Sequence, residues 1–238
     1  MKINNVYCLF EQSGTYKKEF AKFGIHAEDY DILNEFGETD HVCDLFSEID
    51  KAYAGKPSIF DNIGETDLVF AFFPYTRFES RIPLAFRGQQ PQQKNYTDIE
   101  KLENSMKLHE ELHQLYMLIC KLFTICMRGG WRMIVENPYS QPHYLTSYFP
   151  IKPTIIDKDR RLNGDYYKKP TQFWFVNCKP EENMCIHPIT YIKTSTIDKA
   201  DIDVKCESRK TARSMMHPQY AYRFIAQYIV DSETGFVE

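Results

Sequence analysis

Runs of apolar residues alternate along this chain with segments of helical period, and this alternation limits the fold more than any other feature. The clearest strand pattern is Asp67 to Phe73, which is almost entirely apolar, as a strand covered on both faces should be. We expect further strands at 4–10, 25–32, 131–135 and 172–177, and helices at 15–23, 48–54, 97–128 and 214–230. Strands that alternate with helices favour an α/β fold with a mostly parallel central sheet and helices on both faces.

Length and composition favour a single domain. The chain has 238 residues, 43% of them hydrophobic, and a formal net charge of −4, so any nucleic-acid site must be a local patch. No apolar run approaches the roughly 20 residues of a membrane span, and the first ten residues lack the pattern of a signal peptide. The seven cysteines are scattered without a C-x-x-C pair. We therefore expect a cytoplasmic protein with reduced thiols and no membrane partner.

The longest helix has recognisable boundaries. Thr97 is placed as the N-cap, Asp98 and Glu100 fall in the first turn, and Gly129-Gly130 ends the pattern. The polar segment 81–95 before it is expected to be a mobile loop, and region 150–206 is expected to hold strands and turns.

Chemistry in such a sheet is expected beyond the carboxyl ends of the strands, where ligands bind. A tight turn after the first strand, ending at Gly14-Thr15, would direct backbone N–H groups at a ligand. Asp31 ends the second strand, where an acid can accept hydrogen bonds from ribose hydroxyls. Asp44, in the sequence VCDL, is a candidate for the end of a third strand, and Pro74-Tyr75 and Glu136 follow the strands at 67–73 and 131–135.

In this order, the motifs resemble those of the DNA cytosine methyltransferases, especially the short phage-type members. The matching stretches are Leu9-Phe10-x-x-x-Gly14-Thr15-Tyr16, Asp31-Ile32, Asp44-Leu45, Asp67 to Pro74, Arg132 to Pro138, Lys169-Pro170-Thr171 with Phe173-Trp174, and the closing helix from Arg213 to Ile229. The resemblance implies a Rossmann-like S-adenosylmethionine-dependent methyltransferase fold over residues 1–238 as one domain. Region 150–206 would then be a small strand-rich insertion in place of a target recognition domain.

The resemblance also implies a cofactor, a partner and a set of site residues. S-adenosylmethionine would contact Phe10, Gly14, Thr15, Asp31, Asp44 and Pro74. The partner would be DNA, whose target cytosine the family flips out of the duplex. Glu136 of the E-N-P motif would hydrogen-bond the flipped base as a catalytic residue, and Arg77 and Arg81 would face the DNA.

The chain departs from the family at the nucleophile, because the family's Pro-Cys is Pro74-Tyr75 here. A tyrosine hydroxyl has a reference pKa of about 10, against about 8.5 for a thiol, so ordinary carbon-5 methylation is not expected. DNA amino-methyltransferases carry Pro-Pro-Tyr at this loop, and their tyrosine stacks on the flipped base, which keeps Tyr75 a candidate catalytic residue. Phe72 stands where those enzymes have an acceptor for the target amine.

The cofactor loop departs as well, since Gln12 replaces its first glycine and Glu11 adds a negative charge near the cofactor's carboxylate. We therefore expect S-adenosylmethionine binding to be weakened or lost. Two functions stay open: an atypical, catalytically impaired DNA methyltransferase, and a non-catalytic pseudo-methyltransferase that binds DNA or a protein partner.

Two further patterns have competing interpretations. Basic residues Arg160, Arg161, Lys168 and Lys169 surround Tyr166 and Tyr167, a mixture that suits a nucleic-acid surface, although a solvated hairpin is the simpler interpretation. His109-Glu110-Glu111-Leu112-His113 matches the H-E-x-x-H zinc pattern. The charged helix around these histidines favours a solvated face, so we expect no metal site.

Overall fold

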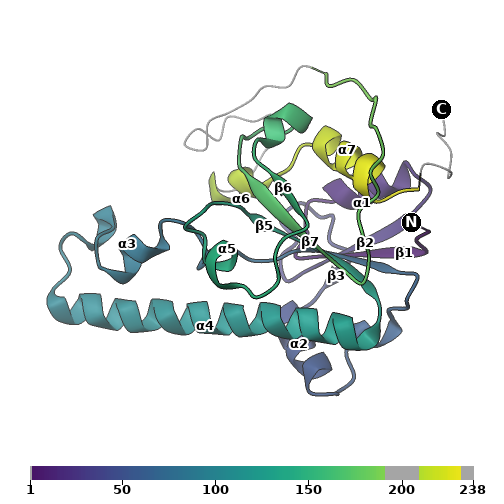
Figure 1. Cartoon of the computed structure of the whole chain (residues 1–238). Helices are drawn as coiled ribbons and strands as arrows, with labels where there is room; N and C mark the ends of the chain where they lie inside the picture. The colour runs from purple at the N-terminus through teal and green to yellow at the C-terminus, as the bar shows by residue number, and fades with distance from the viewer. Residues whose placement is uncertain (1, 191–208, 232–238) are drawn as a thin grey trace.

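The computed structural model describes residues 2–190 and 209–231, and in them the chain forms a seven-stranded sheet (Figure 1). The strands are β1 (Asn5–Leu9), β2 (His26–Asp31), β3 (His41–Val42), β4 (Leu68–Phe72), β5 (Arg132–Pro138), β6 (Ile155–Asp157) and β7 (Thr171–Val176). They lie in the order β3-β2-β1-β4-β5-β7-β6. Strands β1 to β5 are parallel, and β7 runs antiparallel to both β5 and β6. This confirms the expected α/β fold with a mostly parallel, Rossmann-like sheet.

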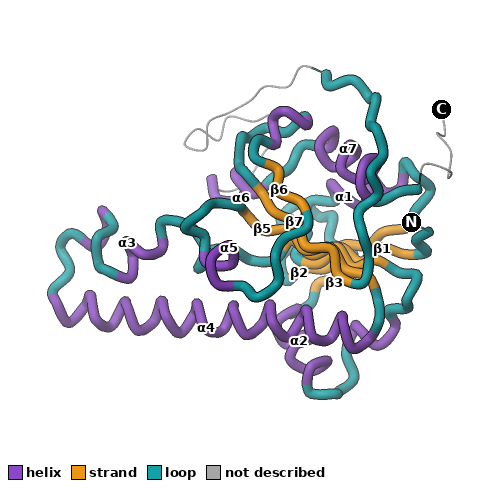
Figure 2. The backbone as a smooth tube through the Cα atoms, in the orientation of Figure 1, coloured by secondary structure: helices purple, strands orange, loops and turns teal. Residues whose placement is uncertain are grey.

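Helices cover both faces of the sheet (Figure 2). They are α1 (Thr15–Ala21), α2 (Leu45–Tyr53), α3 (Ile82–Phe86), α4 (Asp98–Gly129), α5 (Tyr144–Tyr148), α6 (Arg209–Ser214) and α7 (Pro218–Tyr228), with 3-10 turns η1 (Ile59–Asn62), η2 (Pro91–Gln93) and η3 (Arg160–Asn163). Helices α1 and α7 pack on one face, and α2, α4 and α5 pack on the other. None of the described helices is long and apolar enough to cross a bilayer.

The position of β4 in the middle of the sheet explains why its sequence is nearly all apolar. Its alternate side chains point to opposite faces, so Leu68 and Phe70 pack toward α1 and α7 while Val69 and Ala71 pack toward α2 and α4. All four side chains are fully buried. A central strand in a sheet covered on both faces has no solvent-facing side, and this explains the continuous apolar run.

Helix α4 begins and ends at the expected residues. The Thr97 side chain accepts from the Glu100 N–H at 3.3 Å, and the Glu100 carboxylate accepts from the Thr97 N–H at 2.7 Å, which forms a capping box. Gly130 ends the helix in the left-handed conformation, at φ 71°.

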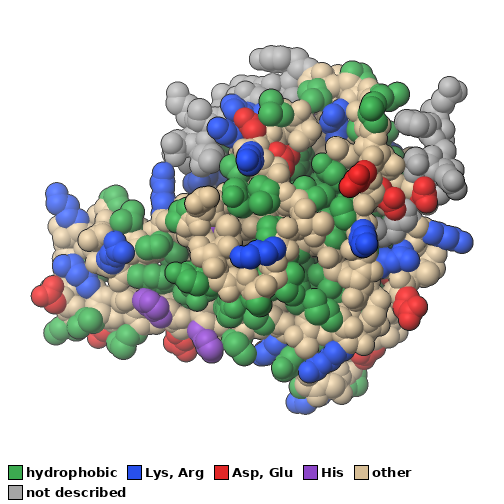
Figure 3. Space-filling model, viewed as in Figure 1, with side chains coloured by type: hydrophobic (Ala, Val, Ile, Leu, Met, Phe, Trp, Pro, Cys, Tyr) green, Lys and Arg blue, Asp and Glu red, His purple; other side chains and the backbone are tan. Residues whose placement is uncertain are grey.

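The expectation of a mobile loop at 81–95 is wrong, because this segment contains α3 and η2. Ile82 and Ala85 of α3 are buried with Leu108 of α4, and the Gln93 side-chain amide donates to the Ala85 carbonyl at 3.1 Å. These elements and the start of α4 project beyond the sheet (Figure 1), and we call residues 81–107 the arm. Basic and hydrophobic side chains are interspersed over it (Figure 3).

Two boundaries differ from the sequence prediction. Strand β5 continues through Glu136-Asn137-Pro138, because these residues pair with the start of β7. The helix expected at 214–230 is α7, which begins only at Pro218, where the His217 side chain caps it by accepting from the Gln219 N–H at 2.9 Å; the separate short helix α6 ends at Ser214. Region 150–206 contributes β6 and β7 to the edge of the central sheet, and its residues 191–206 lie outside the described residues.

Candidate functional site

The two candidate catalytic residues lie at the carboxyl ends of neighbouring parallel strands. Glu136 in β5 lies opposite Phe72 in β4, and Tyr75 follows three residues later. Glu136 is 5% exposed, and its carboxylate accepts a hydrogen bond from the Thr171 hydroxyl of β7. The sheet topology therefore brings an oriented carboxylate close to the loop that carries Tyr75.

Asn137 links the same two strand ends. Its side-chain amide donates to the Phe73 carbonyl at 2.8 Å, and the residue is fully buried. Because Phe73 lies two residues before Tyr75, Asn137 fixes the backbone that leads into the Tyr75 loop. This gives the asparagine of the E-N-P sequence a structural role beside the carboxylate.

Arg160 is fully buried, which corrects the expectation that it lies on an exposed basic surface. Its guanidinium forms an ion pair with Asp165, lies 3.9 Å from a Glu136 oxygen, and stacks 5.4 Å from the centre of the Tyr220 ring. Burial by itself lowers the pKa of Arg160, but the Asp165, Tyr220 and Glu136 side chains raise it above its ordinary value. Arg160 is therefore a buried cation whose positive charge lies beside the Glu136 carboxylate.

The aromatic residues of the basic stretch are also buried, at 7% exposure for Tyr166 and 1% for Tyr167. The Tyr167 hydroxyl donates to the Ala212 carbonyl at 3.2 Å, so this ring belongs to the core and not to a stacking surface. Arg161 is exposed and pairs with Asp159 at 2.8 Å, and Lys168 is exposed.

Lys169 lies at the candidate site itself. Its Nζ is 4.4 Å from the centre of the Tyr75 ring and 3.4 Å from the Tyr75 hydroxyl oxygen. One face of the Tyr75 ring is therefore covered by an ammonium group, a cation–π contact that favours a fixed ring orientation. A base stacked on Tyr75 would have to use the opposite face.

The two arginines expected to face DNA differ in their surroundings. Arg77 forms an ion pair with Glu111 of α4, which ties the Tyr75 loop to the long helix. Arg81 is exposed at the start of the arm.

The expected cofactor residues of the β1–α1 loop adopt the conformations that a tight turn needs. Phe10 and Gly14 have φ of 60° and 70°, and a Cβ on Gly14 would lie 2.8 Å from a Glu38 oxygen. The Phe10 ring packs edge-on against Phe46 and Phe73, at centroid distances of 6.1 and 5.4 Å. Glycine at position 14 is therefore required by the backbone and by the neighbouring side chain.

Of the remaining expected cofactor residues, Thr15 begins α1 directly after the β1–α1 loop, and the others lie at the ends of β2, β3 and β4. Thr15 is buried, with its hydroxyl oxygen 2.8 Å from that of Ser13. Asp31 accepts from the Leu33 N–H at 2.8 Å, and burial raises the pKa of its carboxyl. Asp44 caps α2 by accepting from the Phe46 N–H at 3.1 Å, and Pro74 is partly buried after β4.

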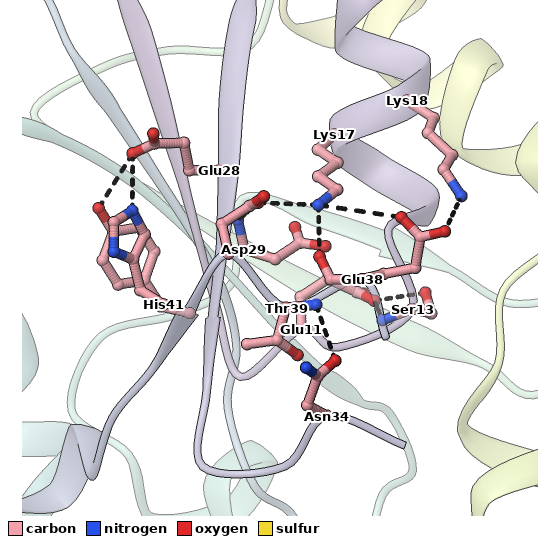
Figure 4. Close-up of polar contacts among 12 residues, drawn as sticks. Glu11, Ser13, Lys17, Lys18, Glu28, Asp29, Asn34, Glu38, Thr39 and His41 are labelled. Atoms are coloured by element: carbon pink, nitrogen blue, oxygen red, sulfur yellow. Dashed lines mark hydrogen bonds and ion pairs between the residues drawn. The ribbon is translucent and has the colours of Figure 1, made fainter. Parts of the chain in front are cut away.

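Acidic side chains form contacts at the β1–α1 loop that the sequence did not predict (Figure 4). Glu11 accepts from the Ser13 N–H at 2.6 Å and from the Ser13 hydroxyl. Asp29 in β2 is fully buried, and burial, followed by the nearby Glu11 carboxylate, raises its pKa to about 8. An aspartate in the middle of a buried strand is the sequence signal that could have identified this position.

The segment between β2 and β3 is held by contacts to this loop and to the start of α1 (Figure 4). Lys17 pairs with Asp40 at 2.8 Å, and Lys18 pairs with Glu38 at 2.6 Å. The Gln12 side chain accepts from the backbone N–H of residue 35 at 2.9 Å. The end of β1 is therefore enclosed by polar contacts from a neighbouring connection.

The H-E-x-x-H sequence on α4 lies in an ordinary helical surface. The His109 ring stacks on Phe86 of the arm at 4.1 Å, and its Nδ1 lies 2.8 Å from the Ser105 carbonyl. Among residues 2–190 and 209–231, no group of three or more acidic, histidine or cysteine side chains could hold a metal ion.

Neither the protein-family models nor the curated protein sequences contain a match to this chain. The fold and the geometry of the site define the class: an α/β protein of Rossmann-like architecture. Its candidate site lies at the carboxyl ends of β1, β4 and β5, with Glu136 in β5 and, in the loop after β4, Tyr75 in contact with Lys169.

Proposed function

We propose that this protein is a DNA methyltransferase-like protein of the cytosine-methylase type, with atypical chemistry because tyrosine occupies the nucleophile position. The observation that carries the proposal is the placement of Glu136. This carboxylate is buried at the end of β5, is held by Thr171 and Arg160, and lies beside the loop of Tyr75. An acid so placed and so supported is suited to orienting a base inserted between the ends of β4 and β5.

The sheet supports the methyltransferase type. The order β3-β2-β1-β4-β5-β7-β6, with antiparallel β7 between β5 and β6, resembles that of S-adenosylmethionine-dependent methyltransferases. In an open sheet of this kind, ligands bind beyond the carboxyl ends of the strands, where Phe10, Asp31 and Pro74 lie. We propose S-adenosylmethionine as the cofactor, which when bound would supply the methyl group.

The protein's own residues would bind and orient the target base. Glu136 would accept a hydrogen bond from the exocyclic amine of a flipped cytosine, while Arg160 and Thr171 hold its carboxylate in position. The free face of the Tyr75 ring would stack on the base, since Lys169 covers the other face. Arg81 and Lys168, which are exposed, would contact the DNA backbone.

A second function is favoured by the absence of a nucleophilic thiol at the Tyr75 loop in the described part of the chain. Cys8 lies within β1, and burial, followed by the negative charge of Asp29, raises the pKa of its thiol well above the ordinary value. Such a thiol is a poor nucleophile. The alternative function is therefore a pseudo-methyltransferase that binds DNA or a protein partner without chemistry.

Methyl transfer and DNA binding should be measured together on the wild type, on Glu136→Gln and on the control Glu110→Gln, which changes an exposed acid of α4. We expect methylated base by mass spectrometry from the wild type and the control, and a loss of about a hundredfold or more in Glu136→Gln. DNA binding without product, unchanged in Glu136→Gln, would establish the alternative. Absence of both binding and product would refute both functions on DNA.

A titration with S-adenosylmethionine tests the proposed cofactor-binding residues separately from Glu136. Calorimetry with S-adenosylmethionine should give binding that is weakened in Asp31→Ala, because Asp31 is proposed to contact the ribose hydroxyls. Binding that is unaffected by Asp31→Ala would place the ligand elsewhere.

A further inference from the structure

The β1–α1 loop uses its own carboxylate to satisfy its hydrogen-bond donors. Glu11 accepts from the backbone N–H of Ser13 at 2.6 Å and from the Ser13 hydroxyl (Figure 4). Burial raises the pKa of the Glu11 carboxyl above its ordinary value, while the hydroxyl and N–H of Ser13 and the N–H of Gln12 act in the opposite direction and favour the carboxylate. An anion that belongs to the protein therefore occupies the donors of this turn.

Donors in such a turn ordinarily receive an anionic group of the ligand. In S-adenosylmethionine the carboxylate is the anionic group, while the sulfonium and the ammonium are positively charged and the adenosine is neutral. With Glu11 in place, the ligand's carboxylate would lose these donors and would approach a second negative charge.

A fully buried acid below the loop adds an independent observation. Asp29 is fully buried, and burial, followed by the negative charge of Glu11, raises the pKa of its carboxyl to about 8, while the Gly14 N–H acts in the opposite direction. The neighbouring cation, Lys17, is engaged with Asp40 and with the backbone carbonyl of Glu38. The cation beside this buried acid is thus already engaged with other partners.

We propose that Glu11 makes this site select an adenosine-type ligand with a positively charged side chain and no carboxylate, in preference to S-adenosylmethionine. The inference rests on the proposed function, since it places a nucleoside ligand at the ends of β1 and β2. Unit charges a few ångströms apart at a protein surface interact strongly enough to change an equilibrium by at least about tenfold. Decarboxylated S-adenosylmethionine, which keeps the sulfonium and the amine, is the matched probe.

The test is a calorimetric titration of the full chain with S-adenosylmethionine and with decarboxylated S-adenosylmethionine. It compares the wild type, Glu11→Gln and the control Glu65→Gln, which removes one exposed negative charge at the opposite ends of the strands. We expect the wild type and the control to bind decarboxylated S-adenosylmethionine at least about tenfold more tightly than S-adenosylmethionine. Glu11→Gln, which keeps the side-chain shape, should reduce this preference to within about threefold.

The outcomes separate this inference from the proposed function. The role of Glu11 would be overturned if the wild type bound S-adenosylmethionine at least as tightly as the decarboxylated ligand, or if the preference for the decarboxylated ligand persisted in Glu11→Gln. Either result would leave the cofactor site intact. If neither ligand binds to any of the folded variants, both the inference and the proposed cofactor are wrong. Circular dichroism of each variant establishes that it is folded.

Discussion

Arg160 and Arg161 are adjacent in sequence but opposite in burial, which makes them a matched pair for mutation. The side chains of Arg160 and Asp165 are 0% exposed, whereas those of Arg161 and Asp159 are 41% and 18% exposed. Methionine at position 160 keeps much of the volume but leaves the carboxylates of Asp165 and Glu136 without their cation. Removing one partner of a buried pair costs about 3–5 kcal/mol, against about 0–1 kcal/mol for an exposed pair.

We therefore expect Arg160→Met to lower the free energy of unfolding by about 3–5 kcal/mol, and Arg161→Met by less than about 1 kcal/mol. Urea denaturation can be followed by the fluorescence of Trp131 and Trp174, which are both buried. With a slope of about 2–3 kcal/mol per M, Arg160→Met should lower the midpoint by about 1–2.5 M. Similar midpoints for the two variants would refute the view that Arg160 compensates buried carboxylates.

Three other changes test the β1–α1 loop and the cysteines. The raised pKa of Asp29, about 8 when folded, means that stability falls as the pH rises from about 4 through 8, so Asp29→Asn should raise the Tm more at pH 8 than at pH 5. A Tm difference that does not depend on pH would contradict this. Gly14→Ala should lower the free energy of unfolding by about 1–2 kcal/mol in urea denaturation. Adding Glu38→Ala should recover only part of that loss, because it removes the contact with the Glu38 carboxylate while the positive φ remains. Burial raises the pKa of the Cys8 and Cys126 thiols, so mass spectrometry after brief maleimide treatment should find them modified only in urea.

Much of the fold could be predicted because its signals are local. The apolar run of β4 and the capping box at Thr97 each specify one element from a few neighbouring residues. The extension of β5 through Pro138 could not be predicted, since it depends on pairing with Thr171, far along the chain. The arm was missed because the polar residues near Gln90 obscured the apolar spacing of Ile82 and Ala85.

At the candidate site, the placement of Glu136 beside the connection that carries Tyr75 follows from the neighbouring positions of β4 and β5. The burial of Arg160 could not be predicted from the sequence around it, because a run of basic and aromatic residues is as typical of an exposed surface as of a buried segment. Arg160 pairs with the nearby Asp165, but its burial also depends on Glu136 and Tyr220, which come from distant parts of the chain. The contact between Glu11 and Ser13 depends in the same way on the exact turn geometry.

The projecting arm has a consequence for how freely its sequence can vary. Helix α4 is about 48 Å long at 1.5 Å per residue, and its first buried residue is Leu108, so roughly its first ten residues lie outside the main core. Local opening of the arm would expose only its small apolar cluster and would leave the sheet intact. Substitutions and insertions there should be tolerated by the rest of the domain, although the arm starts at Arg81, in the same connection that carries Tyr75.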